Sequence, residues 1–487
     1  MIAPNPATPL TPTVNEPAAL RLYAAAATLV TLGVYLLTLA PDLTWANAAT
    51  DGGELITAAV TLGIPHPPGY PLYVVLGKLF SLLPLGTVAL RFNLLSAFCG
   101  ALAVGVLVLA IGAYHRGRVR PSVAVAAALL FGFAPLAWSQ AVVAEVYTLN
   151  LLLLAVFLLA WSRAGASGWS GFWLGLAITT HLTSLLMLPA LLVGRERGRA
   201  VVGLAVGLTP LLLLPILARG DSPVVWGRPV DLAGWWWLVS CRLYAANVQP
   251  ALDGERLLNL LRALAFGPAA LIVARRTTGT TVGDWVVAVQ RQRSTLVLIA
   301  IALAYGVFGL VYGATDAAVM LLPGLMIVAL LLAPRLAALG RAAWLLPALL
   351  VVATFPTQDL SGSEPRALAE AVFAAAPQGA ILLVAGDQTT FTLWYFHHVE
   401  GRRPDVVLVD ANLFAFDWYR ERLARQNPAI LVPVADDLAA FQRLNAPRRP
   451  FCAVGLVAPF PPMMAEAPSG SRPSDGPPYL NCIEGVN

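Results

Sequence analysis

Long stretches without a charged residue constrain this chain more than any other feature. Leu22–Ala40 and Ser294–Gly313 contain no charge at all, and a helix needs roughly 20 apolar residues to cross the hydrocarbon layer of a bilayer. Charged residues make up 12% of the 487 residues, about half of the roughly 25% that is usual in soluble domains. The sequence therefore predicts a polytopic α-helical membrane protein.

About 11 apolar stretches are candidate transmembrane helices. The stretch Gly69–Leu85 is not among them, because it is short, contains Lys78 and is bracketed by prolines; we predict an interfacial or re-entrant helix there. The long stretch Trp169–Val193 is divided into two short helices that meet at a polar patch, Thr179–Ser184. The candidate spans are 20–40, 89–114, 121–138, 144–162, 169–180, 182–194, 198–218, 256–274, 294–313, 316–334 and 340–356.

The arginines predict which side of the membrane each loop occupies. Clusters within 116–120, 195–199, 275–293 and 335–341 all fall on one side of the predicted topology, and the positive-inside rule makes that side the cytoplasm. The net charge of +5 is therefore assigned to topology and not to a nucleic-acid partner. The first large loop, residues 41–88, then lies on the outer face of the plasma membrane.

Composition divides the chain into three parts. Residues 1–18 are rich in Pro, Thr and Ala and predict a disordered cytoplasmic tail, and residues 19–357 form the transmembrane domain. In residues 358–487 charge rises, and two short apolar runs, 380–386 and 405–410, predict buried strands between helical patterns. We expect this part to be a small external α/β domain, in which Cys452 and Cys482 are candidates for a disulfide.

The first large loop carries an acidic motif, Asp51-Gly-Gly-Glu54. Three-residue spacing places both carboxylates on one face of a helix, and a carboxylate there is able to act as general base toward an attacking hydroxyl. The two glycines would let a substrate approach the backbone closely. The alternative is an ordinary helix N-terminus capped by Asp51; spacing alone does not decide between them.

A second motif follows, in which three prolines and a glycine fix a rigid turn that starts at His66 and ends before Tyr73. The functional interpretation is one wall of an active site, with His66 beside Tyr70 and Tyr73 binding an anionic or hydroxyl group. The alternative is a structural turn that returns the chain to the membrane.

Weaker candidates lie elsewhere. Glu145 and Tyr147 stand at the external end of a predicted span, and His181 lies in the polar break between two short helices. Trp226 is one of several aromatic residues in the loop 219–255, where side chains either stack on sugar rings or form an interfacial belt. The alternatives for Glu145 and His181 are a solvated charge and a packed, hydrogen-bonded histidine.

Two further acidic residues, Asp316 and Asp387, each stand where a predicted helix begins. A capping role explains both without any function. Asp387 also follows a predicted strand, and ligands of open α/β sheets bind at such strand ends. Because no Gly-x-Gly-x-x-Gly fingerprint is present, we do not expect a nucleotide there.

Several motifs occur together in one known family. They are Asp51-Gly-Gly-Glu54-Leu-Ile-Thr-Ala-Ala, Thr61-Leu-Gly-Ile-Pro-His-Pro-Pro-Gly-Tyr-Pro-Leu-Tyr73, Arg91-Phe-Asn-Leu-Leu-Ser96, Trp138-Ser-Gln-Ala-Val-Val-Ala-Glu-Val-Tyr147-Thr-Leu-Asn150, Thr180-His-Leu-Thr-Ser184, Gly386-Asp-Gln-Thr-Thr-Phe391 and Arg403-Pro-Asp-Val406. With them the chain resembles the bacterial and animal family that includes transmembrane protein 260, formerly a domain of unknown function. That family is grouped with the GT-C glycosyltransferases, and its animal member is a protein O-mannosyltransferase.

The resemblance implies a GT-C fold and transfer of a sugar, with mannose suggested, from a polyprenyl-phosphate donor with inversion of the anomeric centre. It implies Asp51 as the base and Glu54 as its assistant. His66 and Arg91 are candidates for the phosphate side, since arginine donates paired hydrogen bonds to phosphate. The acceptor is a protein, a lipid or a glycan. The external loops show no dense Asp/Glu cluster, so we expect neither a metal nor another cofactor.

Two other functions compete with a transferase. A transporter or flippase for lipid-linked sugars would be expected to show inverted repeats and broken helices near the midplane, and the sequence shows no convincing repeat. A non-catalytic membrane scaffold with an external binding domain would make the acidic loop incidental. Turnover of a labelled polyprenyl-phosphate sugar separates these three functions.

Overall fold

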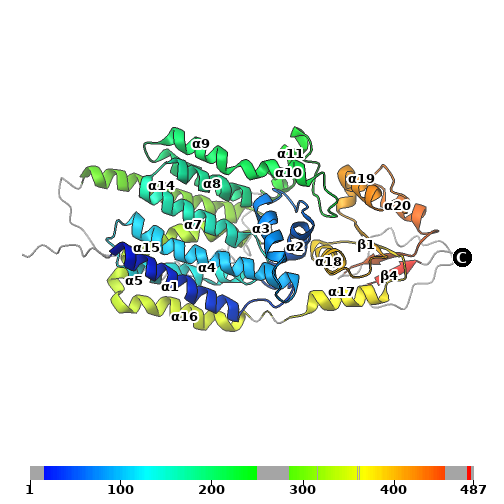
Figure 1. Cartoon of the computed structure of the whole chain (residues 1–487), viewed down its shortest axis with the longest axis horizontal. Coiled ribbons are helices and arrows are strands. Elements are labelled where there is room, and N and C mark those ends of the chain that lie inside the picture. Colours follow the sequence, from blue (N-terminus) through cyan, green and yellow to red (C-terminus); the bar gives the residue numbers. More distant parts are fainter. Residues whose placement is uncertain are drawn as a thin grey trace, which may run out of the picture.

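The computed structural model describes residues 16–248, 285–314, 316–358, 360, 362–455 and 480–483. Figure 1 shows a bundle of long helices at one end and a smaller unit with a sheet at the other, and the first large loop lies between them. The predicted span 256–274, the tail 1–15 and the loop Pro468–Pro478 fall outside the described residues.

The bundle consists of apolar helices that lie roughly side by side (Figure 1). In the part of the chain that the structure describes, six helices are long and apolar enough to cross a membrane, or seven if one bent pair is a single span. The chain is therefore a polytopic helical membrane protein. Its helices are α1 Glu16–Leu37, α4 Val88–Tyr114, α5 Pro121–Gly132, α6 Pro135–Ala141, α7 Tyr147–Ala164, α8 Gly168–Thr180, η2 Leu182–Leu192, α9 Arg197–Gly207, η3 Thr209–Leu213, α10 Leu214–Leu217, α14 Trp285–Val311, η6 Ala317–Leu321, α15 Leu322–Leu336, η7 Ala337–Trp344 and α16 Leu345–Thr354.

Three breaks shape the bundle. The span predicted at 121–138 is bent by 71° between α5 and α6, where Pro135 occupies the first turn of α6. The polar patch separates α8 from the 3-10 helix η2, because His181 is extended with φ −162° and ψ 126°. Between α15 and α16 helical geometry is lost at Gly340, whose φ is +55°.

The first large loop folds into two short helices, α2 (Gly52–Thr61) and α3 (Pro71–Ser81), which pack on each other. Helix α3 is apolar and has 11 residues, fewer than a crossing requires, in agreement with the interfacial or re-entrant helix predicted there. Gly69, with φ +90°, and Tyr70, with φ +41°, turn the chain into α3. Lys78 donates from Nζ to the carbonyl of Val60 at 2.6 Å and so joins the two helices.

The C-terminal unit, residues 362–455 with 480–483, is built on a four-stranded sheet in the order β2-β1-β3-β4. The two strands predicted from sequence are β1 and β2, which pair in parallel, as do β1 and β3; β4 is antiparallel to β3. Its elements are α17 Glu364–Ala375, β1 Ile381–Val384, α18 Asp387–Trp394, the π-helix η9 Tyr395–Val399, β2 Val407–Asp410, α19 Asp417–Gln426, α20 Leu438–Asn445, β3 Phe451–Val454 and β4 Leu480–Ile483.

A disulfide joins Cys452 of β3 to Cys482 of β4, and the other two cysteines, Cys99 and Cys241, are free. We expect protein isolated without reductant and then denatured to take up two equivalents of a thiol label, and four after reduction. Mass spectrometry of the labelled peptides identifies the sites. Four labelled cysteines before reduction would show that the pair is not bonded in the cell.

The two glycines of the acidic motif have different surroundings. A methyl group at Gly53 would overlap the main-chain carbonyl of Phe391 in α18, whereas one at Gly52 would meet its nearest atom, the oxygen of Ala144, at 3.4 Å. The close approach at Gly53 is therefore made by the protein's own backbone and not by a substrate, which corrects the expectation from sequence.

This difference gives opposite expectations for one substitution at adjacent positions. Gly53→Ala should lower the free energy of unfolding by about 1–3 kcal/mol, because the added methyl overpacks a backbone contact. Gly52→Ala should raise it by up to about 1 kcal/mol through helix propensity. Thermal unfolding of the two variants in detergent tests the pair, and equal shifts would contradict the packing of α18 on α2.

Candidate active site

Helix α2 places the two carboxylates of the acidic motif at its beginning. Asp51 occupies the N-cap position, yet its side chain makes no capping hydrogen bond to the described residues, so the capping alternative does not account for it. The Asp51 side chain is 33% exposed, while the Glu54 side chain in the first turn is fully buried. One carboxylate is thus accessible to a substrate and the other is not.

Glu54 is held by His66. Its Oε1 accepts a hydrogen bond from the main-chain N–H of His66 at 3.0 Å, and its Oε2 lies 2.5 Å from Nδ1 of the imidazole. The other ring nitrogen of His66, Nε2, lies 2.9 Å from the Tyr70 hydroxyl and 3.8 Å from Oδ2 of Asp51. The rigid turn therefore positions the imidazole between the two carboxylates. Their negative charges offset the free-energy cost of desolvating a buried imidazolium.

Aromatic rings surround this histidine. The ring centroid of Tyr70 lies 5.1 Å from that of His66, and the rings of Trp226 and Tyr244 each lie at 6.3 Å, all edge-on. Trp226 reaches this position because Val225 beside it pairs with Ile64, next to the rigid turn. The Trp226 indole N–H is buried and has no hydrogen-bond partner among the described residues.

Burial and neighbouring charges shift the pKa values of Asp51 and His66. Burial raises the pKa of Asp51 to about 7; the negative charges of Glu54, Asp316 and Asp387 add to this, and the positive charge of His66 opposes it. For His66, burial acts to lower the pKa, but the carboxylates of Glu54 and Asp51 outweigh it and raise the pKa to about 10. At neutral pH the site therefore holds an imidazolium beside a carboxyl group that is close to half ionised.

A second group of candidates lies around the start of α7. The Tyr147 hydroxyl donates to Oδ2 of Asp316 at 2.8 Å, and its ring lies 5.5 Å from that of His181. Asp316 therefore bonds a side chain instead of capping its helix. The small cavity beside them, of about 220 Å³, is lined by Tyr147, Asn150, Leu151, His181, Thr183, Val319, Met320, Leu322 and Pro323.

Glu145 connects the two groups. It is 4% exposed, and burial together with the charges of Asp51 and Asp316 raises its pKa well above the ordinary value. A solvated interfacial charge, the alternative from sequence, does not describe a carboxyl group this deeply buried. Burial thus favours the neutral form of this carboxyl group, which is a hydrogen-bond donor as well as an acceptor.

Two of the predicted substrate-binding residues lie outside both groups. Arg91 donates to the main-chain carbonyls of Ser81, Leu85 and Gly86 at 2.5, 2.8 and 3.1 Å, so its guanidinium satisfies the carbonyls that the end of α3 leaves open. Tyr73 is fully buried against Phe92, with ring centroids 6.2 Å apart. Neither is placed to bind a phosphate at His66.

The structure adds residues that were not proposed as site residues. Tyr244 and Arg242 belong to the 3-10 helix η4 (Arg242–Asn247), and the exposed Arg242 makes no ion pair within the described part of the chain. No spacing rule links this loop to His66, because the contact between them is long-range. Among the described residues, no group of three His, Cys, Asp or Glu side chains is arranged to hold a metal.

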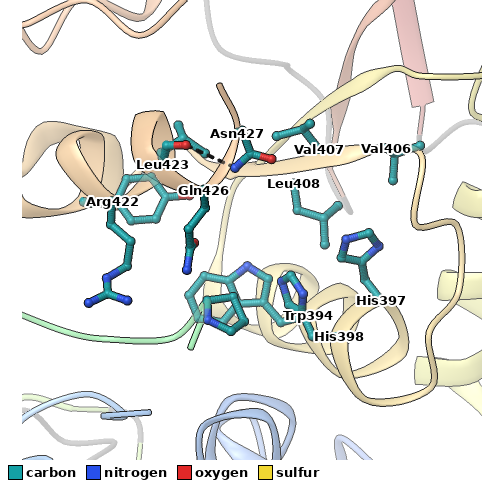
Figure 2. Close-up of a pocket in the computed structure, with 12 residues that line it drawn as sticks. Trp394, His397, His398, Val406, Val407, Leu408, Arg422, Leu423, Gln426 and Asn427 are labelled. Carbon is teal, nitrogen blue, oxygen red and sulfur yellow. Dashed lines mark hydrogen bonds between the residues drawn. The ribbon is translucent and has the colours of Figure 1, made fainter. Parts of the chain in front are cut away.

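A separate cleft of about 460 Å³ lies in the C-terminal unit, beside η9, β2 and α19 (Figure 2). Arg422, on its wall, donates to the carbonyls of Ala218, Gly220 and Ser222, so its charge is already bound to the loop after α10. None of the residues around His66 lines this cleft. It is lined by Pro223, Trp394, His397, His398, Val406, Val407, Leu408, Tyr419, Arg422, Leu423, Gln426 and Asn427.

Comparison with solved structures identifies a protein with a similar fold. The chain is similar to ArnT from Cupriavidus metallidurans in its apo state, with a TM-score of 0.58 and 14% identity over 97% of this chain and 99% of that one. The same enzyme bound to undecaprenyl phosphate gives a TM-score of 0.50 and 15% identity, covering 98% and 100%. The chain therefore shares its fold with ArnT.

Comparison of sequences identifies similar domains and relatives. Residues 51–195 match the N-terminal domain of protein O-mannosyl-transferase TMEM260, and residues 365–435 match TMEM260-associated domain 2. The mouse protein O-mannosyl-transferase TMEM260 is 27% identical over 485 residues, covering 83% of this chain and 67% of the relative. The Dictyostelium discoideum protein of that name is 28% identical over 221 residues, covering 38% and 27%.

The fold and the named relatives support a membrane glycosyltransferase of the GT-C class. Within that class, the chain is similar to the TMEM260 family, whose two domain models match residues 51–195 and 365–435. Asp51 is the first residue of the N-terminal match, and the helix α18 lies within the second.

Proposed function

We propose that this protein transfers a sugar from a polyprenyl-phosphate donor to an acceptor hydroxyl, with inversion, on the outer face of the plasma membrane. The observation that carries the proposal is a partly exposed carboxylate, Asp51, with a pKa raised to about 7, beside a fully buried Glu54–His66 pair. A base whose pKa lies near the working pH is ionised often enough to act and basic enough to take a proton.

In the proposed reaction the acceptor oxygen attacks the anomeric carbon while Asp51 removes the hydroxyl proton. The bond between the anomeric carbon and the phosphate oxygen breaks, and the lipid phosphate leaves with the electron pair. A single displacement of this kind inverts the anomeric centre. Because phosphate is a competent leaving group, the protein's task is to align the attack and to stabilise charge.

Glu54 and His66 prepare the site in this proposal. Glu54 fixes the imidazole through two hydrogen bonds, and the imidazolium lies near enough to Asp51 to keep that carboxylate oriented and to attract the donor phosphate. Arg242, which belongs to η4 with Tyr244 and forms no ion pair with the described residues, is a second candidate for the same phosphate. Arg91 loses this role, since its donors are bound to main-chain carbonyls.

In this proposal the remaining candidate residues line the substrate-binding site. Trp226 and Tyr70 line the side of His66, and Glu145, Tyr147 and His181 line the side of Asp316. Mannose as the sugar and protein as an acceptor are supported by the names of the mouse and Dictyostelium relatives; lipid and glycan acceptors remain alternatives. A polyprenyl donor is supported by undecaprenyl phosphate bound to ArnT.

The proposal includes the arrangement predicted from sequence. A cytoplasmic tail, 1–18, precedes a transmembrane domain, 19–357, of about 11 helices, and an external unit, 358–487, follows. The enzyme uses no metal and no cofactor beyond its lipid-linked donor. The disulfide between Cys452 and Cys482 supports an external position for the C-terminal unit, since such bonds persist in oxidising compartments.

The test is turnover of the donor. Purified protein is incubated with polyprenyl-phosphate sugars labelled in mannose, glucose or an amino sugar, together with peptide, lipid and glycan acceptors. We expect release of polyprenyl phosphate and label in one acceptor class. A protein that moves labelled donor across vesicles without cleaving it would be a flippase, and a protein that does neither would be a scaffold.

The raised pKa of Asp51 predicts the pH dependence of the reaction. Only the ionised carboxylate accepts a proton, so kcat/KM should rise with pH and level off above about pH 7. Below that value it should fall tenfold per pH unit. An acid limb with a midpoint near pH 4, the usual range of a carboxyl group, would contradict the environment described for Asp51.

A further inference from the structure

Helix α18 of the C-terminal unit is packed directly on the helix that carries the acidic motif. Gly53 accommodates the carbonyl of Phe391, and Trp45, just before α2, donates from Nε1 to Oγ1 of Thr392 at 2.9 Å. The two contacts involve consecutive residues of α18. They fix the position of this helix relative to Asp51, which stands two residues before Gly53.

Further contacts near α18 fix the C-terminal unit relative to the first loop. Arg366 of α17 bonds Asp42 in the first loop at 2.6 Å and Glu400 after η9 at 2.8 Å. The Tyr395 hydroxyl, directly after α18, accepts from the main-chain N–H of Ala89 at 3.2 Å. The C-terminal unit is therefore attached both to the first loop and to the start of α4, in addition to the contact between α2 and α18.

This packing brings Asp387, the first residue of α18, to the active site. Asp387 lies one helical turn before Phe391, about 6 Å along the axis, and it is close enough to Asp51 and His66 to interact with both charges. Gly386 holds the N-cap position, so Asp387 is not the cap expected from sequence. Its exposed carboxylate makes no hydrogen bond or ion pair within the described residues.

A second, independent group is also without a partner. The Trp226 indole N–H is buried beside His66, on a residue that is only 7% exposed, and no acceptor is provided for it by the described residues. A buried donor without an acceptor costs free energy unless a ligand or water supplies one. The site therefore presents a buried donor without an acceptor beside His66 and, at the start of α18, an exposed carboxylate without a protein partner among the described residues.

A ligand that satisfies both groups carries hydroxyls. A carboxylate accepts hydrogen bonds from hydroxyl groups, which themselves accept from an indole N–H. A phosphate would suit Trp226, but Asp387 repels it. The shared chemistry is that of a sugar ring, which arrives either on the lipid donor or on a glycan acceptor.

We propose that Asp387 binds hydroxyl groups of a sugar in the Asp51 site, so that the C-terminal unit supplies a substrate-binding residue to the catalytic loop. The inference rests on the proposed transferase function. It assigns binding of sugar hydroxyls to a residue of α18, which lies outside the first loop.

The test compares Asp387→Asn with Asp417→Asn. Asp417 is matched to it, because it is also exposed and is the first residue of a helix, α19, in the same unit. Loss of hydrogen bonds to a charged acceptor predicts a rise of about 10- to 100-fold in KM for one substrate in Asp387→Asn. Asp417→Asn should keep wild-type KM values, and both variants should unfold at similar temperatures.

The substrate whose KM rises identifies the source of the sugar. A change confined to the labelled donor assigns Asp387 to the transferred sugar, and a change confined to the glycan acceptor assigns it to the acceptor. If wild-type protein transfers sugar and Asp387→Asn behaves as Asp417→Asn does, this inference is wrong while the proposed function stands. If wild-type protein turns over no donor, the proposed function itself fails.

Discussion

Asp51→Asn is expected to lower kcat for sugar transfer by about 10²–10⁴-fold, the usual contribution of a general base. The amide has the size of the carboxylate but cannot take the acceptor's proton. The KM for the donor should change little, because the side chain acts on the acceptor hydroxyl. Initial rates of polyprenyl-phosphate release, measured across donor concentrations, separate the two constants.

Two companion variants sharpen this test. Asp221→Asn removes an exposed carboxylate from the loop after α10 and should leave kcat unchanged. Asp51→Glu keeps a base but moves it by one methylene, so a partial loss is expected, smaller than that of Asp51→Asn. Wild-type kcat in Asp51→Asn would show that another group takes the proton.

Glu54→Ala is expected to destabilise the protein by about 3–5 kcal/mol, because it leaves the buried His66 imidazolium without its main partner. The Glu54 side chain is fully buried and that of His66 is 12% exposed, so water cannot replace the lost carboxylate. Activity should fall with stability, since the imidazole then has nothing to orient it. Thermal or denaturant unfolding in detergent measures the change.

The control is an exposed ion pair in which a glutamate also pairs with a cation. Arg228 and Glu421 lie 3.4 Å apart with side chains 58% and 60% exposed, and Glu421→Ala should cost at most about 1 kcal/mol. Equal losses in the two variants would contradict the burial of the Glu54–His66 pair.

The same pair predicts how stability depends on pH. The pKa of His66 is raised to about 10 in the folded protein, against about 6.5 when unfolded. Its stabilisation is therefore complete below about pH 6.5 and is lost as the pH rises toward 10. In Glu54→Ala this loss should be smaller, which a comparison of unfolding temperatures at pH 6 and pH 9.5 measures.

Much of the first loop was predictable because its residues carry strong local preferences. Prolines and glycines around His66 allow few conformations, and the short apolar run with Lys78 is too brief to cross a bilayer. The break at His181 was visible as polar residues inside an apolar stretch. In each case the deciding interaction lies within about ten residues of sequence.

The roles of single side chains were less predictable, because distant contacts decide them. Arg91 has the chemistry of a phosphate ligand, yet the carbonyls at the end of α3 take its donors. Substrate access does not explain Gly53, because the main-chain carbonyl of Phe391 packs against it. The capping roles suggested for Asp316 and Asp387 fail for the same reason, since no local pattern reveals Tyr147 or Asp51 as their neighbours.

The contact between Trp45 and Thr392 joins residues that are 347 positions apart in sequence. The acidic motif is therefore translated well before α18. A growing chain thus contains Asp51 and Glu54 long before the helix that packs on α2 has been made. The packing around the acidic motif is therefore complete only after α18 has been synthesised.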